Sequence, residues 1–207
     1  LKNGVRPLTT IMTPTYEIFT KGDKIVLPKD LKGKSIRGSG GTQDKALASI
    51  GAVPVSTPAA EVYEAFERGV LDVVPFSYSS VQGYSIQEIA NFSTKGVGFA
   101  GGSIGFFMNE EVFQSLPKDI QDIFIQVGKE TTENLSREFQ KREETLSRQW
   151  EEEGILEIYE LTEEEKKVWK ESFSGFAEEW AKTIEEEEGL PGMEVLKMYR
   201  EALERQK

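Results

Sequence analysis

Short apolar segments and amphipathic segments alternate along the first half of the chain, with turn residues at most junctions. Short apolar runs predict strands, and amphipathic segments that end at glycine predict helices. The predicted strands are Tyr16–Thr20, Lys24–Leu27, Ser35–Arg37, Val53–Val55 and Val70–Phe76, and the predicted helical segments are Pro28–Gly33, Thr42–Ile50 and Ala59–Arg68. Strands and helices that alternate at this spacing predict a parallel α/β sheet.

The second half is predominantly helical after one more predicted strand, Ser103–Met108. From Pro117 to Gly154, apolar residues recur at intervals that are mostly three or four, which predicts one helix. About 37 residues at about 1.5 Å each make a helix of roughly 55 Å, so it must brace two lobes or project from one. A strand over Ile155–Tyr159 and helices over residues 162–187 and 193–205 complete the predicted elements.

Composition excludes several classes of enzyme. The chain has no Cys and no His, which rules out thiol enzymes, His-based catalytic triads and zinc hydrolases. The formal net charge of −11 argues against a nucleic-acid partner, which needs clustered Lys and Arg. No apolar run reaches the ~18 residues that a membrane-spanning helix needs.

The negative charge is confined to the second half. Residues 1–100 hold 11 Lys and Arg against 9 Asp and Glu, whereas residues 101–207 hold 14 against 27. The acidic runs lie inside helical patterns and lack the spacing of a calcium loop, which favours solvated helix faces. The chain begins at Leu1 without an initiating Met, and we interpret it as the remainder of a longer protein whose signal preceded this segment.

Two features follow the predicted strand Ser35–Arg37. Arg37 ends the strand, where ligands of open α/β sheets bind, so it forms either an ordinary ion pair or an anion-binding contact. The glycine loop Gly38-Ser39-Gly40-Gly41 comes next. Because Gln43 occupies the position of the last glycine in a dinucleotide-binding motif, a tight turn with close backbone approach is favoured over nucleotide binding.

Phe76, Ser77 and Tyr78 stand at the end of another predicted strand and could face the same crevice. Aromatic rings with hydroxyl groups suit a pocket for a small organic ligand, but core packing and turn formation explain them equally well. No pair of carboxylates is singled out for catalysis, and the chain has no Gly-x-Ser-x-Gly motif. The residues therefore favour a binding protein over an enzyme.

An ordered string of segments resembles one family. The segments are Asp30–Arg37, Ile50–Val55, Ala60–Ala65, Arg68–Asp72, Met108-Asn109 and Ser115–Pro117. In this order they resemble the extracytoplasmic solute-binding proteins of tripartite ATP-independent periplasmic (TRAP) transporters, of the DctP type. The resemblance is strongest over residues 28–117 and continues by layout beyond them.

The resemblance implies a type II periplasmic-binding fold with a parallel-rich sheet, which closes on a small organic acid without a cofactor. Residues 1–108 would form the α/β ligand-binding lobe, and residues 109–207 would form the bracing helix and the C-terminal helices. Closure would occur about hinge strands near Thr15–Thr20 and Ser103–Met108. The missing N-terminal lobe would supply the other wall of the cleft. The receptor would be periplasmic, and held at the membrane by its permease or by a lost N-terminal anchor.

The resemblance also assigns site residues. Arg37 matches the arginine that pairs with the ligand carboxylate, and Gly38 and Gly40 would let backbone approach the ligand. Phe76, Ser77 and Tyr78 would line the pocket, and Phe106 would form its floor. Phe76 stands where dicarboxylate and sugar-acid binders often have Asn, and Ala59 and Val73 also depart from the common pattern. These changes favour a monocarboxylate with an apolar or aromatic body.

Two alternatives remain open from the sequence. One is an enzyme on the same fold that uses paired carboxylates. The other is a sensor or interaction module whose acidic helices dock a partner.

Overall fold

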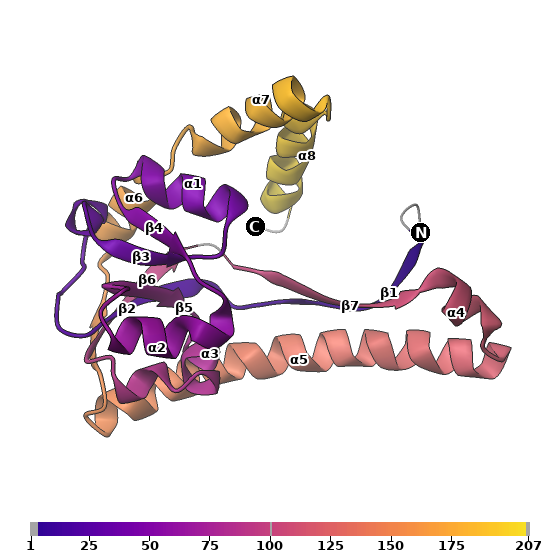
Figure 1. The fold of residues 1–207 in the computed structure, drawn as a ribbon, viewed down its shortest axis with the longest axis horizontal. Coiled ribbons are helices and arrows are strands. Elements are labelled where there is room, and N and C mark those ends of the chain that lie inside the picture. Colours follow the sequence, from indigo (N-terminus) through magenta and orange to yellow (C-terminus); the bar gives the residue numbers. More distant parts are fainter. Residues whose placement is uncertain (1–3, 100, 206–207) are drawn as a thin grey trace.

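The computed structural model describes residues 4–99 and 101–205, and in them the chain forms a six-stranded sheet with helices on both faces and a separate two-stranded ribbon (Figure 1). The strands are β1 Val5–Met12, β2 Tyr16–Thr20, β3 Ser35–Gly38, β4 Val53–Ser56, β5 Val73–Phe76, β6 Phe92–Phe99, β7 Ser103–Asn109 and β8 Glu157–Glu160. The helices are α1 Gly41–Ser49, α2 Val62–Glu67, α3 Tyr78–Gly83, α4 Glu110–Ser115, α5 Lys118–Glu152, α6 Glu163–Ser172, α7 Phe176–Glu188 and α8 Gly192–Glu204. Short 3₁₀ turns lie at Pro28–Leu31, Ala59–Glu61 and Ile86–Glu88.

The strand order is β4-β3-β5-β2-β6-β8, and the sheet is mixed. β3 pairs parallel with β4 and β5, and β6 pairs parallel with β8. β2 lies between β5 and β6 and is antiparallel to both. The predicted parallel-rich α/β fold is therefore confirmed, with β2 as the exception.

Each face of the sheet carries its own core because successive side chains of a strand point to opposite faces. One core contains Phe19, Val74 and Trp150 and is covered by α2, α3 and α5. The other contains Ile18, Val73 and residues of α1 and α6. β2 and β5 thus contribute adjacent residues to different cores.

Some predicted elements differ from the structure, and some observed elements, among them β6, were not predicted. Residues 24–27 are not a strand, because the Asp30 carboxylate accepts hydrogen bonds from the N–H groups of Val26 and Leu27 and holds them in a turn. The helix predicted over residues 162–187 is broken at Gly175, which has φ of 86°. β6, at Phe92–Phe99, was not predicted, since Ser, Thr, Lys and Gly interrupt its apolar pattern.

The long helix α5 is confirmed and has 35 residues, which span about 52 Å. Its C-terminal part packs under the sheet through Leu146 and Trp150, and its N-terminal part lies along the ribbon of β1 and β7 (Figure 1). The Thr9 and Thr132 hydroxyls are 2.6 Å apart across this contact. The division of the chain at residue 108 stays a prediction.

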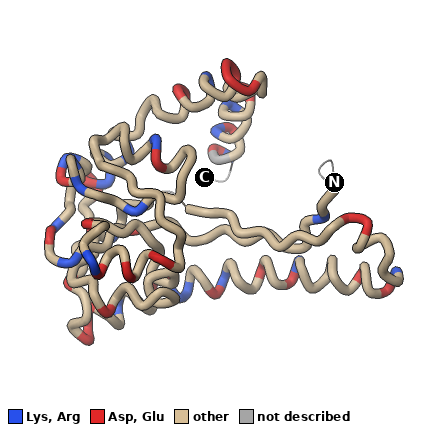
Figure 2. Tube along the Cα trace, in the orientation of Figure 1, with Lys and Arg blue, Asp and Glu red and all other residues tan. Residues whose placement is uncertain are grey.

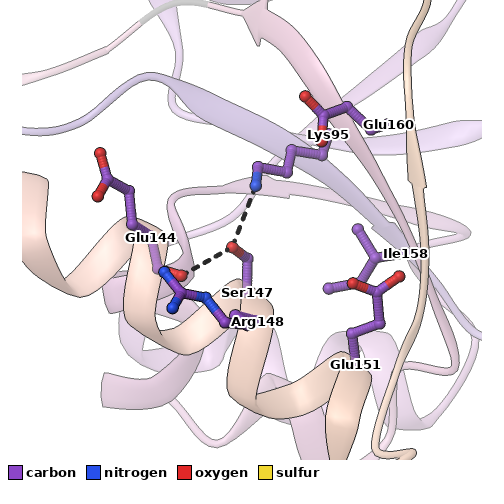
Figure 3. Close-up of a pocket in the computed structure, with 7 residues that line it drawn as sticks. All are labelled: Lys95, Glu144, Ser147, Arg148, Glu151, Ile158 and Glu160. Atoms are coloured by element: carbon purple, nitrogen blue, oxygen red, sulfur yellow. Dashed lines mark hydrogen bonds between the residues drawn. The ribbon is translucent and has the colours of Figure 1, made fainter.

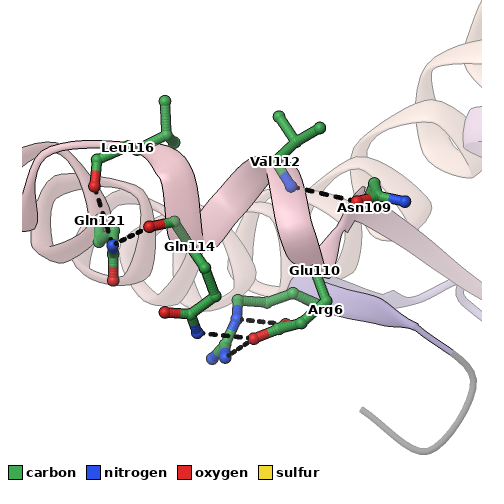
Figure 4. A network of polar contacts seen from close by, with 7 residues as sticks. All are labelled: Arg6, Asn109, Glu110, Val112, Gln114, Leu116 and Gln121. Carbon is green, nitrogen blue, oxygen red and sulfur yellow. Dashed lines mark hydrogen bonds and ion pairs between the residues drawn. The ribbon is translucent and has the colours of Figure 1, made fainter.

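The outer end of the ribbon is fixed to α4 by a two-pronged ion pair (Figure 4). The Nε and Nη2 atoms of Arg6 donate to the Glu110 carboxylate at 2.9 and 2.6 Å, and the Arg6 guanidinium lies over the Phe113 ring. The Asn109 side chain accepts a hydrogen bond from the Val112 N–H and caps α4. The ribbon itself carries almost no charge (Figure 2), and several of its apolar side chains are exposed: Met12, Ile104, Phe106 and Phe107.

We predict that Gly128→Ala destabilises the chain by about 1–3 kcal/mol, since the added methyl group overpacks the contact between α5 and β1. A Cβ at Gly128 would lie 1.9 Å from the Leu8 carbonyl oxygen, so the strand and the helix would have to separate. Gly83→Ala is the matched control, because a Cβ there meets nothing within 4 Å. Urea denaturation followed by circular dichroism measures both variants. Equal stabilities for the two would contradict the prediction.

Candidate ligand-binding site

Arg37 lies near the carboxyl end of β3, and its side chain is only 6% exposed. Its Nε donates to the Thr57 carbonyl oxygen at 3.2 Å, and its guanidinium carbon lies 5.0 Å from the centroid of the Phe76 ring. Within residues 4–99 and 101–205, no carboxylate lies within ion-pairing distance of Arg37, and its terminal nitrogens have no hydrogen-bond partner. A buried cation without a counter-charge is costly, so this geometry favours an anionic ligand.

Aromatic rings surround Phe76 beside this guanidinium. The Phe76 side chain is buried, the Tyr84 ring stacks with it at a centroid distance of 5.5 Å, and the Tyr16 ring meets it edge-on at 6.0 Å. Tyr84 keeps 39% of its surface exposed. The ring that faces Arg37 is therefore part of an aromatic cluster, which includes two tyrosines that the sequence did not single out.

The glycine loop after β3 is held by the first turn of α1. The N–H of Ser39 donates to the Gln43 side chain at 3.1 Å, and the N–H of Gly40 donates to Asp44 at 2.9 Å. A Cβ at Gly38 would lie 2.1 Å from Asp44 Oδ1, so glycine is needed for this close approach. The group that approaches the backbone of this tight turn is thus the Asp44 side chain. A role of Gly38 and Gly40 in contacting the ligand stays a prediction.

Ser77 and Tyr78 directly follow Phe76 in sequence, but their side chains make contacts within the folded chain. The Ser77 hydroxyl accepts a hydrogen bond from the Ser80 N–H and caps α3. The Tyr78 ring lies in the core beside Trp150, and its hydroxyl is 3.0 Å from Ser93 Oγ. The structure therefore differs from the prediction that both side chains line a pocket, because α3 begins at Tyr78 and turns the ring inward.

Phe106 is not brought together with Arg37. It lies in β7, pairs with Thr9 of the ribbon and is 59% exposed. Figure 1 shows the ribbon leaving the six-stranded sheet. Phe106 thus lies outside the sheet that carries Arg37, because β7 pairs with β1, and its role as the floor of the pocket stays a prediction.

Helix α5 contacts the segment that follows the Phe76 strand. The two oxygens of Glu143 accept hydrogen bonds from the backbone N–H groups of Tyr78 and Ser79, at 2.8 and 2.9 Å. Hydrogen bonds to a charged acceptor are stronger than neutral ones. The position of α3, and with it the end of β5, is thus fixed by the long helix.

Glu17 is a buried acid on the same face of the sheet as Phe76, with which it pairs across β2 and β5. Its Oε2 accepts hydrogen bonds from the N–H groups of Gly96 and Val97, both at 2.9 Å. Burial raises the pKa of Glu17 to about 7 against these hydrogen bonds, and the nearby Glu143 charge adds to the increase. Glu17 therefore changes charge near neutral pH.

A polar cavity of about 290 Å³ lies between α5 and the strands β6 and β8 (Figure 3). Lys95 Nζ donates to Ser147 Oγ at 3.3 Å inside it, and Arg148 is the other cation. The carboxylates of Glu144, Glu151 and Glu160 outnumber these cations, which disfavours an acid as its ligand. No group of three or more acidic side chains within residues 4–99 and 101–205 is arranged to hold a metal ion.

The sequence profile of the bacterial extracellular solute-binding proteins, family 7 (DctP), matches residues 1–186. The chain belongs to this DctP family. The predicted resemblance to TRAP solute-binding proteins is confirmed, and the members of this family are described as solute-binding proteins. Among the helices of the described residues, none combines the length and the hydropathy that a membrane crossing requires.

Two curated relatives agree with the DctP assignment. A solute-binding protein of Albidiferax ferrireducens is 33% identical over 118 residues, which cover 55% of this chain and 34% of the relative. The C4-dicarboxylate-binding periplasmic protein DctP of Rhodobacter capsulatus is 24% identical over 82% of this chain and 51% of its own length. The chain thus spans about half the length of one curated relative and about a third of the other.

Solved structures share the DctP fold. A TRAP periplasmic solute-binding protein from Rhodoferax ferrireducens, with bound malonate, is 25% identical at a TM-score of 0.74, over 83% of this chain and 54% of its own. One from Bordetella bronchiseptica, with bound (R)- and (S)-mandelate, is 24% identical at a TM-score of 0.81, over 99% of this chain and 65% of its own. At 24% identity, the similarity to the Bordetella bronchiseptica protein is evidence for the fold alone.

We predict that Glu17→Gln removes a pH dependence of stability. Because the folded pKa of about 7 lies above the ordinary 4.5, the folded chain binds this proton more tightly than the unfolded chain does. Protonated Glu17 therefore contributes about 3 kcal/mol to the free energy of unfolding. This contribution is complete below pH 4.5 and is lost as the pH rises to about 7.

Urea denaturation between pH 4.5 and 7.5 tests this in the wild type and in Glu17→Gln. The free energy of unfolding of the wild type should fall relative to that of the variant as the pH rises. Glu133→Gln, the same chemical change at an exposed position on α5, controls for net charge. Parallel pH profiles of the wild type and Glu17→Gln would contradict the assignment.

Proposed function

We propose that this chain is one lobe of an extracytoplasmic receptor that binds a small organic acid for a TRAP transporter, with Arg37 pairing with the ligand carboxylate. The main support for this proposal is the Arg37 guanidinium, which is almost buried and has no carboxylate partner in the described residues. Its Nε is fixed by the Thr57 carbonyl, so the terminal nitrogens are pre-oriented. A guanidinium binds a carboxylate through two parallel hydrogen bonds, which a lysine cannot reproduce.

The ligand that this geometry favours is a monocarboxylate with an apolar or aromatic body. The Arg37 guanidinium lies over the Phe76 ring, and Tyr16 and Tyr84 pack against that ring and extend its aromatic surface. The relative from Rhodoferax ferrireducens holds malonate, a dicarboxylate, which makes that class the natural competitor. A second carboxylate at this aromatic wall would lose hydration without gaining a cation, so it would bind less well.

The remaining wall of the cleft is proposed to come from a second lobe outside the 207 residues. Exposed apolar side chains on the ribbon and on the adjoining part of α5, among them Phe106, Phe107 and Ile123, support this proposal. The loaded receptor would deliver its acid to membrane permease subunits on the outer side of the cytoplasmic membrane. No nucleic acid is expected as a partner, because the net charge is −11.

We predict that Arg37→Ala weakens binding of the organic acid by about 100-fold or more, which corresponds to about 3 kcal/mol. Arg37→Lys should recover only a small part of the affinity, because an ammonium cannot form the two-pronged contact. Arg68→Ala is the matched control, since Arg68 is exposed and pairs with Glu64 on α2. Isothermal titration of the two-lobed receptor measures all four proteins. If Arg37→Ala left the affinity unchanged, Arg37 would not be the carboxylate-binding residue.

We predict that benzoate and branched 2-oxo acids bind more tightly than succinate or a sugar acid. The reason is the aromatic surface beside Arg37, which favours an apolar body. Competition titrations against one reference acid rank the ligands. Phe76→Asn should shift the ranking toward succinate, whereas a receptor that prefers succinate from the start would contradict the monocarboxylate assignment and leave the role of Arg37 intact.

A further inference from the structure

A cavity of about 560 Å³ lies between α1 and the helices α6 and α7, on the face of the sheet opposite to the Arg37 site. Its apolar lining includes Ala46, Phe99, Trp169, Phe173 and Phe176. The volume is within the range of about 300–1,000 Å³ typical of small-molecule sites. The function proposed above does not use this cavity.

The alternation of β3 separates the two sites. Ile36 belongs to the core under α1 and α6, whereas its neighbour Arg37 stacks on Phe76, which belongs to the other core. Because adjacent residues of a strand point to opposite faces, the sheet itself lies between Arg37 and the cavity. A ligand in the cavity therefore does not contact the Arg37 guanidinium.

One polar group in the cavity wall has no partner. The Nε2 atom of Gln43 is buried and makes no hydrogen bond to the described residues. Its amide orientation is fixed, because Oε1 of the same side chain accepts the Ser39 N–H, and a flipped amide would set a donor against that donor. A buried donor without an acceptor is unfavourable by about 1–3 kcal/mol, so the site favours an oxygen atom from a ligand.

The charges at the rim are positive. Lys166 is paired with Glu163 at 2.8 Å, but Lys170 makes no ion pair with any of the described carboxylates. Lys170 is exposed, so its contribution to binding an anion would be modest. The cavity thus combines aromatic walls, one unused donor and one free cation.

We propose that this cavity is a second binding site, for a small amphipathic anion with an aromatic body. The body would lie against Trp169, Phe99 and Phe173, with an oxygen atom near Gln43 Nε2 and its charge near Lys170. All of these groups come from the chain itself, so the site does not depend on a second lobe.

The test is a titration of the ¹⁵N-labelled Arg37→Ala chain with 2-naphthoate, followed through the indole N–H resonances of its three tryptophans. The Arg37→Ala background removes binding at the first site. Trp169 lines the cavity, whereas Trp150 lies in the opposite core and Trp180 lines a different cavity. We expect a saturable shift of the Trp169 signal with little change at the other two. A Trp169 signal that does not move would overturn the proposal.

Variants on α6 and α1 sharpen the test. Lys170→Glu should weaken the binding that Trp169 reports by about fivefold, while Lys167→Glu is the control, because Lys167 lies outside the cavity and pairs with Glu171. Ala46→Phe should fill the cavity and abolish the shift, with an unchanged circular dichroism spectrum. Equal effects of the two lysine variants would overturn the proposal. So would a two-lobed receptor in which 2-naphthoate no longer shifts Trp169, because the cavity would then be covered by protein.

Discussion

The packing of helix α5 against two separate sheets is the contact on which the rest of the structure depends. Its C-terminal part closes one core through Trp150, and its N-terminal part approaches β1 so closely that only a glycine fits at position 128. Between these contacts, Glu143 binds the backbone at the start of α3. A single rigid element thus determines the position of the ribbon, the core and the strand end beside Arg37. Any movement of the ribbon relative to the sheet must involve this helix.

The charge near the proposed ligand site differs in sign from the net charge of the chain. A chain with a net charge of −11 holds a nearly buried guanidinium at the end of β3, which pairs with no carboxylate of the residues that the structure describes. Burial of this guanidinium against the Phe76 ring lowers the local dielectric screening, which strengthens its interaction with an anion. Acidic and basic positions are mixed along the helices of the second half (Figure 2), where the charges are solvated. In the function proposed above, the sign of the ligand charge follows from Arg37 and not from the total charge.

Much of this architecture could be predicted from periodicity, but the side-chain environments could not. Arg37 follows Ile36 at the end of an apolar strand, a pattern that predicts both the strand and the exit of Arg37 at its end. Nothing in the local pattern shows that β7 pairs with β1, so the placement of Phe106 on a separate ribbon could not be predicted. The burial of β6 depends on hydroxyls that find distant partners: Thr94 donates to the Ile25 carbonyl and Ser93 contacts Tyr78. Long-range hydrogen bonds of this kind leave no periodic signal.

The short edges of the main sheet have a consequence for association. The outer strands β4 and β8 have four residues each. β4 contains Pro54, which has no N–H to offer a neighbouring strand, and β8 begins and ends with glutamates. A foreign strand would find few hydrogen-bonding groups and repulsive charge at these edges. The lobe is therefore protected against edge-to-edge aggregation even when its apolar ribbon is exposed.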